Sequence, residues 1–149
     1  KILFLSQTMP QVSFYILPEP KKPLPFTCQL AQTVLAKSND ALAIICPEAL
    51  LLDLDEKLWS FSDTAFIPHS IVANPNDIPP AMGVILTAYS PFVHQFDGIM
   101  INLTEQSLTP FTGSRLLEII AFDEPSRVIG REKYRIYQQL GWQLTTFEI

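Results

Sequence analysis

Short apolar runs alternate with helical patterns along this chain, and prolines separate many of them. The runs with the length and composition of β-strands span residues 12–17, 41–46, 83–87, 98–103 and 142–149. The segments with the apolar spacing of helices span residues 25–37, 48–59, 113–121 and 125–140, and residues 60–70 predict an irregular connection. Strands that alternate with helices favour a parallel sheet that is covered on both faces. The pattern therefore predicts an α/β fold, a three-layer α/β/α sandwich with a largely parallel sheet of about five strands.

Length and composition favour one globular domain. The chain has 149 residues, 48% of them hydrophobic and 17% charged, and this composition excludes general disorder. We expect a single domain over residues 10–149, with residues 1–9 as an N-terminal extension. No apolar run reaches the roughly 18 residues of a membrane span, and the first residues do not form a signal peptide, so we expect a cytoplasmic protein.

The sequence lacks the motifs of nucleotide, metal and hydrolase sites. No two of the five glycines are close enough for a phosphate-binding loop. Cys28, Cys46, His69 and His94 have no metal-ligand spacing, and the two cysteines are expected to be buried free thiols. His69 could pair with Asp63 as a general base, but no motif positions a nucleophile. We therefore expect no catalytic residues, cofactor or metal, and a hydrolase that uses His69 is the least favoured alternative.

Acidic residues gather in the predicted helix over residues 48–59. Asp53, Asp55 and Glu56 stand among leucines there, as on the solvated side of an amphipathic helix. Over the whole chain, 15 acidic residues outnumber 10 basic ones, for a net charge of −5. This balance argues against broad, direct binding of nucleic acid, which requires a positive field.

A basic cluster stands out against this acidic background, in the predicted helix over residues 125–140. The polar and aromatic positions on one side of that helix are Arg127, Arg131, Tyr134, Arg135 and Gln138. The apolar positions on the opposite side are Ile129, Ile136 and Leu140. We expect this apolar row to hold the helix against the sheet.

The arginines favour an anionic ligand, although a merely solvated helix face is the alternative. Guanidinium groups suit bidentate contacts with carboxylate or phosphate. Arg127 and Arg131 are like charges at i and i+4, an arrangement that is unfavourable unless an anion joins them. Gly130, beside Tyr134, leaves a gap where a side chain would stand. The pattern predicts a small anionic site beside an apolar pocket, for an acidic peptide or a nucleic-acid backbone.

Two segments resemble signatures of a known family, the chi subunit of bacterial DNA polymerase III. Residues 131–142 (REKYRIYQQLGW) resemble its C-terminal signature, and residues 54–59 (LDEKLW) followed by 66–69 (FIPH) resemble its second signature. Residues 14–17 (FYIL) and 99–103 (IMINL) are similar to its first and fourth strands. The resemblance covers residues 10–149, and the proline-rich loop after the first strand departs from the family pattern.

The resemblance implies a non-catalytic member of the clamp-loader assembly, with a fold related in shape to nucleotide-binding domains but without nucleotide. Chi subunits bind the acidic, phenylalanine-ended C-terminal tail of single-stranded-DNA-binding protein, and they bind the psi subunit, which tethers them to the clamp loader. The positions that match the tail site are Arg127, Arg131, Tyr134 and Arg135, with Ile120 as an apolar neighbour. Those that match the psi-facing patch are Trp59, Phe66, Ile67 and Pro68. The alternative, a module that binds single-stranded nucleic acid directly, requires a longer positive groove with several stacking aromatics.

Overall fold

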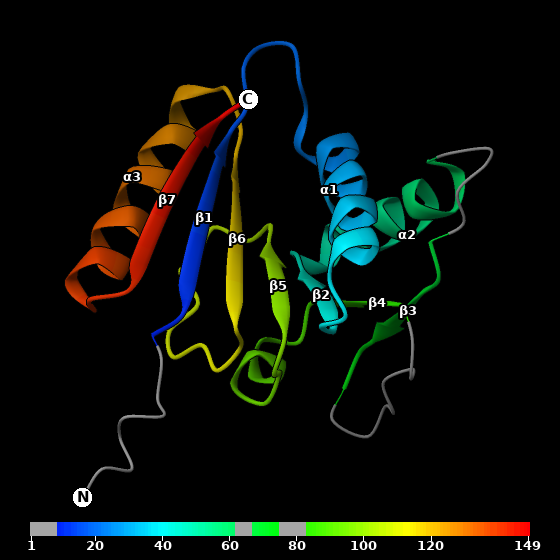
Figure 1. The fold of residues 1–149 in the computed structure, drawn as a ribbon. Helices are drawn as coiled ribbons and strands as arrows, with labels where there is room; N and C mark the ends of the chain where they lie inside the picture. Colours follow the sequence, from blue (N-terminus) through cyan, green and yellow to red (C-terminus); the bar gives the residue numbers. More distant parts are fainter. Residues whose placement is uncertain (1–8, 62–66, 75–82) are drawn as a thin grey trace, which may run out of the picture.

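A computed structural model describes residues 9–61, 67–74 and 83–149. Its sheet has seven parallel strands in the order β3-β4-β2-β5-β6-β1-β7 (Figure 1). The strands are β1 (Gln11–Ile16), β2 (Leu42–Ile45), β3 (His69–Val72), β4 (Val84–Thr87), β5 (Ile99–Asn102), β6 (Arg115–Ile120) and β7 (Gln143–Glu148). The helices are α1 (Pro23–Lys37), α2 (Leu51–Ser60) and α3 (Glu124–Gln139), with short 3₁₀ turns η2 (Glu48–Leu50) and η3 (Ser90–His94).

The sheet separates two apolar cores, as the predicted three-layer architecture requires. On one face, Cys28 of α1 and Leu54 of α2 pack in a cluster with Ile101 of β5. On the other, Tyr137 of α3 packs in a cluster with Phe14 of β1 (Figure 1). Helices therefore cover both faces, and the α/β prediction is confirmed. Cys28 and Cys46 are buried and free, also as predicted.

The segment predicted as a helix over residues 113–121 is a strand, and this prediction was wrong. It forms β6, which pairs with β5 on one side and with β1 on the other. Leu116 and Leu117 are both fully buried, on opposite faces of the sheet. A strand that is covered on both faces has no alternation of apolar and polar residues, so a short apolar run of this kind cannot be told from a buried helix by periodicity.

The structure also contains a strand that the sequence pattern missed. β3 begins in the last two residues of the predicted irregular connection and continues beyond it, and it pairs with β4 at one edge of the sheet. Only Val72 of its four residues is buried when backbone and side chain are counted together. Such a short edge strand has too little apolar character to stand out in the sequence.

Helix α3 begins and ends with recognisable local signals. Asp123 caps its first turn by accepting a hydrogen bond from the backbone N–H of Ser126 at 3.1 Å. Pro125 occupies the first turn, where its missing N–H costs no hydrogen bond. Gly141, with φ of 79°, follows the last turn in a conformation that side chains disfavour.

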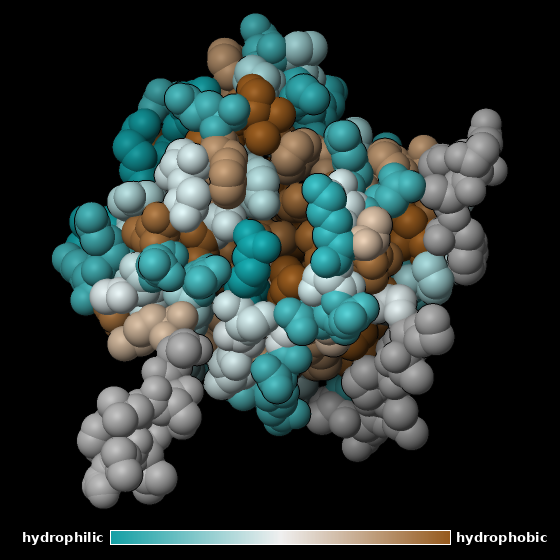
Figure 2. Space-filling model, viewed as in Figure 1, coloured by the Kyte–Doolittle hydropathy of each residue, from teal (hydrophilic) through white to brown (hydrophobic). Residues whose placement is uncertain are grey.

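The face that α3 turns to the sheet differs from the predicted one. Its buried residues are Gly130, Lys133 and Tyr137. The apolar row of Ile129, Ile136 and Leu140 lies along one flank of the helix, and Leu140 is 44% exposed. The expectation that this row holds α3 to the sheet was therefore wrong. The face that packs on the sheet includes a lysine and a glycine, and a search for apolar periodicity does not count either residue type. Figure 2 shows hydrophilic side chains gathered over the outer side of α3.

A buried polar network explains why a lysine can face the sheet. Lys133 Nζ lies 2.9 Å from Glu118 Oε1 of β6 and donates to the carbonyl of Thr104 at 2.6 Å. Tyr137 and Asn102 donate to the other carboxylate oxygen, at 2.7 and 2.9 Å. Burial raises the pKa of Glu118, while Lys133, Tyr137 and Asn102 act in the opposite direction. The network ties α3 to β5 and β6, and so fixes the helix that carries the arginines.

Candidate functional site

A pocket of about 230 Å³ opens between α3 and the ends of three parallel strands. Its residues from the sheet are Phe14, Ile16, Ile120, Thr146 and Glu148, and those from α3 are Arg127, Gly130, Arg131 and Tyr134. β6, β1 and β7 are neighbours in the sheet, and α3 follows directly after β6 in the chain. The pocket therefore collects residues from both halves of the sequence at one edge of the molecule.

The floor of the pocket is apolar. Phe14 and Ile120 are buried, and the ring of Tyr134 lies against that of Phe14 with centroids 5.3 Å apart. A Cβ atom at Gly130 would stand 2.9 Å from the Cδ1 atom of Ile120. The missing side chain lets α3 approach β6 closely, so Ile120 occupies the position where the sequence predicted a gap, and that prediction was wrong. The slot lies beside this contact, where Gly130 and Tyr134 both line the pocket. A slot of this composition suits an apolar or aromatic group.

The rim of the pocket carries positive charge. Arg127 Nε donates to the carbonyl of Phe122 at 3.0 Å, and its guanidinium lies 5.5 Å from the centre of the Phe122 ring. Arg131 pairs with Glu124 at 2.7 Å, and the two side chains are 66% and 70% exposed. An ion pair this exposed contributes little and is easily exchanged for another carboxylate. Arg131 is thus available to an anionic ligand.

The structure brings four of the five predicted tail-site residues together and separates the fifth. Ile120, Arg127, Arg131 and Tyr134 all line the pocket. Arg135 is not among the lining residues, and its exposed side chain pairs with Glu132 on the outer side of α3. Helical spacing placed Arg135 on the same side as Arg131, but the pocket lies nearer the start of the helix.

Sequence analysis missed the strand residues of this pocket. Phe14 and Ile16 alternate along β1 and therefore point to the same face of the sheet, which is a usable signal. Thr146 and Glu148 come from β7, which pairs with β1 in parallel. Their place in the pocket depends on strand order, which the sequence does not state. Glu148 adds one negative charge to a wall that also carries two arginines.

The residues of the predicted psi-facing patch lie in different environments. Trp59 is 53% exposed near the end of α2, and Pro68 is half-buried. Ile67 is only 2% exposed and packs in the core beneath α1 and α2. The assignment of Ile67 to a surface patch was therefore wrong, since its side chain points inward from the chain that leads into β3. Phe66 lies outside the described residues.

His69 has a partner that the sequence did not indicate. Its Nε2 atom lies 2.9 Å from Oδ1 of Asp55 on α2, and its side chain is fully buried. Asp63, the partner considered from the sequence, lies outside the described residues. Asp53 and Glu56 are exposed, as predicted for a solvated face, whereas Asp55 turns toward β3. A buried imidazole of this kind has no access to a substrate.

The described ranges contain neither a metal-binding cluster nor a membrane-spanning helix. Within residues 9–61, 67–74 and 83–149, no group of three or more His, Cys, Asp or Glu side chains could hold a metal ion. None of the helices described there is long and apolar enough to cross a bilayer. The chemistry that the pocket offers is recognition of an anion beside an apolar group.

Comparison with known proteins assigns the family. Residues 9–145 match the family model described as DNA polymerase III chi subunit, HolC. The chain belongs to the chi subunit family. This chain is 31% identical over 140 residues to DNA polymerase III subunit chi of Pseudomonas aeruginosa. The aligned region covers 91% of this chain and 94% of that protein. It is 26% identical over 121 residues to the subunit of the same name from Haemophilus influenzae. That aligned region covers 80% of this chain and 82% of the Haemophilus protein.

The family assignment agrees with the resemblance found in the two signature segments. The C-terminal signature of the chi family, residues 131–142, forms the second half of α3 and the turn after it. Its Arg131 and Tyr134 line the pocket. The second signature, residues 54–59 and 66–69, covers most of α2 and the start of β3.

Proposed function

We propose that this chain is a non-catalytic adaptor of the DNA polymerase III holoenzyme in the cytoplasm. In this role it links the clamp loader, through psi, to the C-terminal tail of single-stranded-DNA-binding protein. One observation carries the tail-binding half of the proposal. The pocket combines two arginines, Arg127 and Arg131, with an apolar slot next to Gly130.

The shape of the pocket suits an acidic tail that ends in phenylalanine. The terminal ring fits the slot between Phe14 and Ile120, next to Gly130. The α-carboxylate then lies within reach of Arg131, and the acidic residues before it follow the basic side of α3. A terminal carboxylate and an aromatic side chain are recognised together, so each supplies part of the affinity.

The psi-binding half of the proposal is supported by Trp59. A tryptophan with 53% of its surface exposed is a typical anchor for a protein partner. It is on α2, beside β3 at one edge of the sheet, whereas the pocket lies against β7 at the other edge. The two surfaces are therefore far enough apart in the fold for two partners to bind at once.

The direct test is a titration with two ligands. Calorimetry with an acidic peptide that ends in a free phenylalanine carboxylate should show binding, and the same peptide with a C-terminal amide should bind more weakly. A single-stranded oligonucleotide serves as the second ligand and should not bind under the same conditions. Binding of the oligonucleotide but not of the peptide would replace the adaptor role with direct nucleic-acid binding.

A further inference from the structure

The buried ring of His69 connects two elements that are distant in sequence. Its Nδ1 atom lies 2.8 Å from the carbonyl oxygen of Ile67, and its Nε2 atom lies 2.9 Å from Oδ1 of Asp55. Both ring nitrogens of His69 therefore have a hydrogen-bonding partner, and the ring is held on two sides. His69 is the first residue of β3 and Asp55 belongs to α2, and the contact therefore joins helix to strand.

Trp59 lies directly on this pair. It follows Asp55 by one helical turn on α2, so both side chains lie on the same side of the helix. The centroids of the Trp59 and His69 rings are 4.4 Å apart, with an interplanar angle of 50°. A tilted pair of aromatic rings at this separation is attractive beyond the apolar area that it buries. One side of Trp59 is thus held against a fixed polar group.

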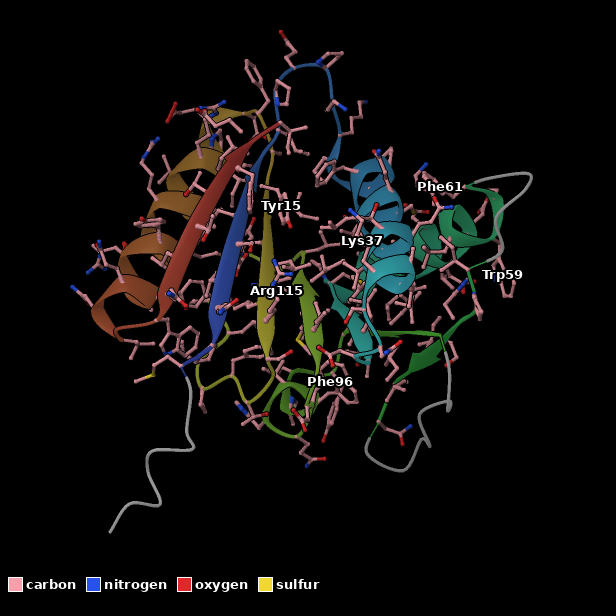
Figure 3. All side chains as sticks on the ribbon, in the orientation of Figure 1. Tyr15, Lys37, Trp59, Phe61, Phe96 and Arg115 are labelled. Atoms are coloured by element: carbon pink, nitrogen blue, oxygen red, sulfur yellow. The ribbon has the colours of Figure 1, made fainter. Side chains whose placement is uncertain are left out.

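Much of the surface of Trp59 nevertheless remains exposed. The residue is 53% exposed and lies at the outer edge of the molecule, near β3 (Figure 3). Asp55 keeps 32% of its side chain exposed, so solvent screens its contact with His69 and the contact contributes little net stability. Fold stability alone is therefore a weak reason for this arrangement, and orientation of the exposed indole is a better one.

We propose that Asp55 and His69 are positioning residues that hold Trp59 in one orientation for its protein partner. The inference rests on the proposed function of Trp59 as part of the psi-facing surface, and it extends that function to two residues that the partner does not touch. A ring that is already ordered loses less conformational entropy when the partner docks. The two halves of the second family signature, which contribute Asp55 with Trp59 and His69, would then form one structural unit.

The first experiment tests the orientation of Trp59 without any partner. The chain has two tryptophans, so 5-fluorotryptophan labelling gives two ¹⁹F resonances, which a Trp59→Phe variant assigns. Asp55→Ala and His69→Gln should each shift the Trp59 resonance toward that of a solvent-exposed indole. The Trp142 resonance should stay in place, because that ring stacks on Tyr137 in the other core, at 5.1 Å between centroids.

Two control variants make this result specific. Glu56→Ala removes a carboxylate from an exposed neighbour on the same helix and should leave both resonances unchanged. Asp55→Asn keeps an oxygen that can accept from His69 and should restore most of the wild-type Trp59 signal. If Asp55→Ala moves the Trp142 resonance as well, it has disturbed the fold, and His69→Gln and Asp55→Asn then decide the question. An unmoved Trp59 resonance in folded His69→Gln protein overturns the proposal.

The second experiment measures binding of the psi subunit from the same bacterium. Asp55→Ala and His69→Gln should each weaken binding by about 3- to 10-fold, the effect of ordering one large side chain. In a Trp59→Ala background, Asp55→Ala should cause no further loss, because there is then no indole to position. Independent, multiplying losses would show that Asp55 contacts the partner itself and would overturn the proposal. If psi does not bind the wild-type chain, the psi link fails, while the ¹⁹F result still decides whether the pair positions Trp59.

Discussion

Arg131 is the residue in the pocket whose charge a ligand can most easily recruit. Its partner Glu124 is exposed, and Arg135 one turn later is paired with Glu132 in a similar way but does not line the pocket. Arg131→Ala should therefore weaken binding of an acidic tail peptide by about 1.5–3 kcal/mol, which is about 10- to 150-fold in affinity. This is the range of a charge-assisted hydrogen bond. Arg135→Ala is the matched control and should have a much smaller effect. Calorimetry that finds equal losses for both arginines would mean that general charge, and not the pocket, binds the peptide.

Substitution of Lys133 tests how much the buried network contributes to stability. Lys133→Met leaves the Glu118 carboxylate buried without its cation and should lower the free energy of unfolding at pH 7 by about 3–5 kcal/mol. A second substitution, Glu118→Gln in the Lys133→Met chain, removes the stranded charge and should recover part of this loss.

The loss caused by Lys133→Met should depend on pH. Burial already raises the pKa of Glu118 from its ordinary 4.5, and Lys133 opposes that rise, so the substitution raises the folded-state pKa further. Above pH 4.5 the folded variant then binds more protons than the unfolded chain, and its stability falls as pH rises through this window. Urea unfolding at pH 4.5 and pH 7 should show a smaller gap to wild type at the lower pH. A gap that is constant over this range would show that Glu118 keeps its charge without Lys133.

At the level of elements, the close approach of α3 to β6 at Gly130 sets the shape of the pocket. Gly130→Ala places a Cβ atom against Cδ1 of Ile120, at 2.9 Å if nothing moves. We expect weaker peptide binding with little change in stability, because the roughly 1 kcal/mol that alanine gains over glycine in a helix offsets the displacement of Ile120. Adding Ile120→Val removes the Cδ1 atom and should restore part of the binding. Calorimetry on the single and double variants measures peptide affinity, and urea unfolding measures stability. Undiminished binding by Gly130→Ala would show that the aromatic ring of the peptide binds elsewhere.

For the whole molecule, the pocket predicts a mixed response to salt. The contacts of the exposed arginines weaken as ionic strength rises, since the screening length falls from about 10 Å at 0.1 M to about 3 Å at 1 M. The apolar floor at Phe14 and Ile120 is not screened. Peptide affinity, titrated across this range, should therefore fall without vanishing. An affinity that does not depend on salt would show that the arginines do not contribute to peptide binding. A complete loss of binding at moderate salt would show that the apolar slot does not contribute.

Because Trp59 and the pocket lie at opposite edges of the sheet, we expect two partners to bind independently. β3, near Trp59, and β7, beside the pocket, form opposite edges of the seven-stranded sheet (Figure 1). Trp59→Ala should weaken co-purification of a psi partner by 10-fold or more, on the order of a hot-spot residue. The same protein should bind the tail peptide with wild-type affinity. Loss of peptide binding in folded Trp59→Ala protein would mean that the two surfaces act as one.

Local patterns in the sequence were sufficient for much of this fold. The alternation of apolar runs and amphipathic segments predicted the α/β class, and capping and proline signals predicted the bounds of α3 to within one residue. The 3.6-residue spacing also placed Arg127, Arg131 and Tyr134 on one side of a helix. These features depend on contacts between residues close in sequence, so they can be read without the fold.

Only the tertiary structure decided which side chains meet. It made a strand of residues 115–120, placed Phe14 and Glu148 in the same pocket as Arg131, and buried Ile67 while leaving Trp59 exposed. It also turned Lys133 inward, because Glu118 on a neighbouring strand could pair with it, and it paired His69 with Asp55 across 14 residues. Strand order and burial depend on contacts between distant segments of the chain, and apolar periodicity records neither a buried ion pair nor the order of parallel strands.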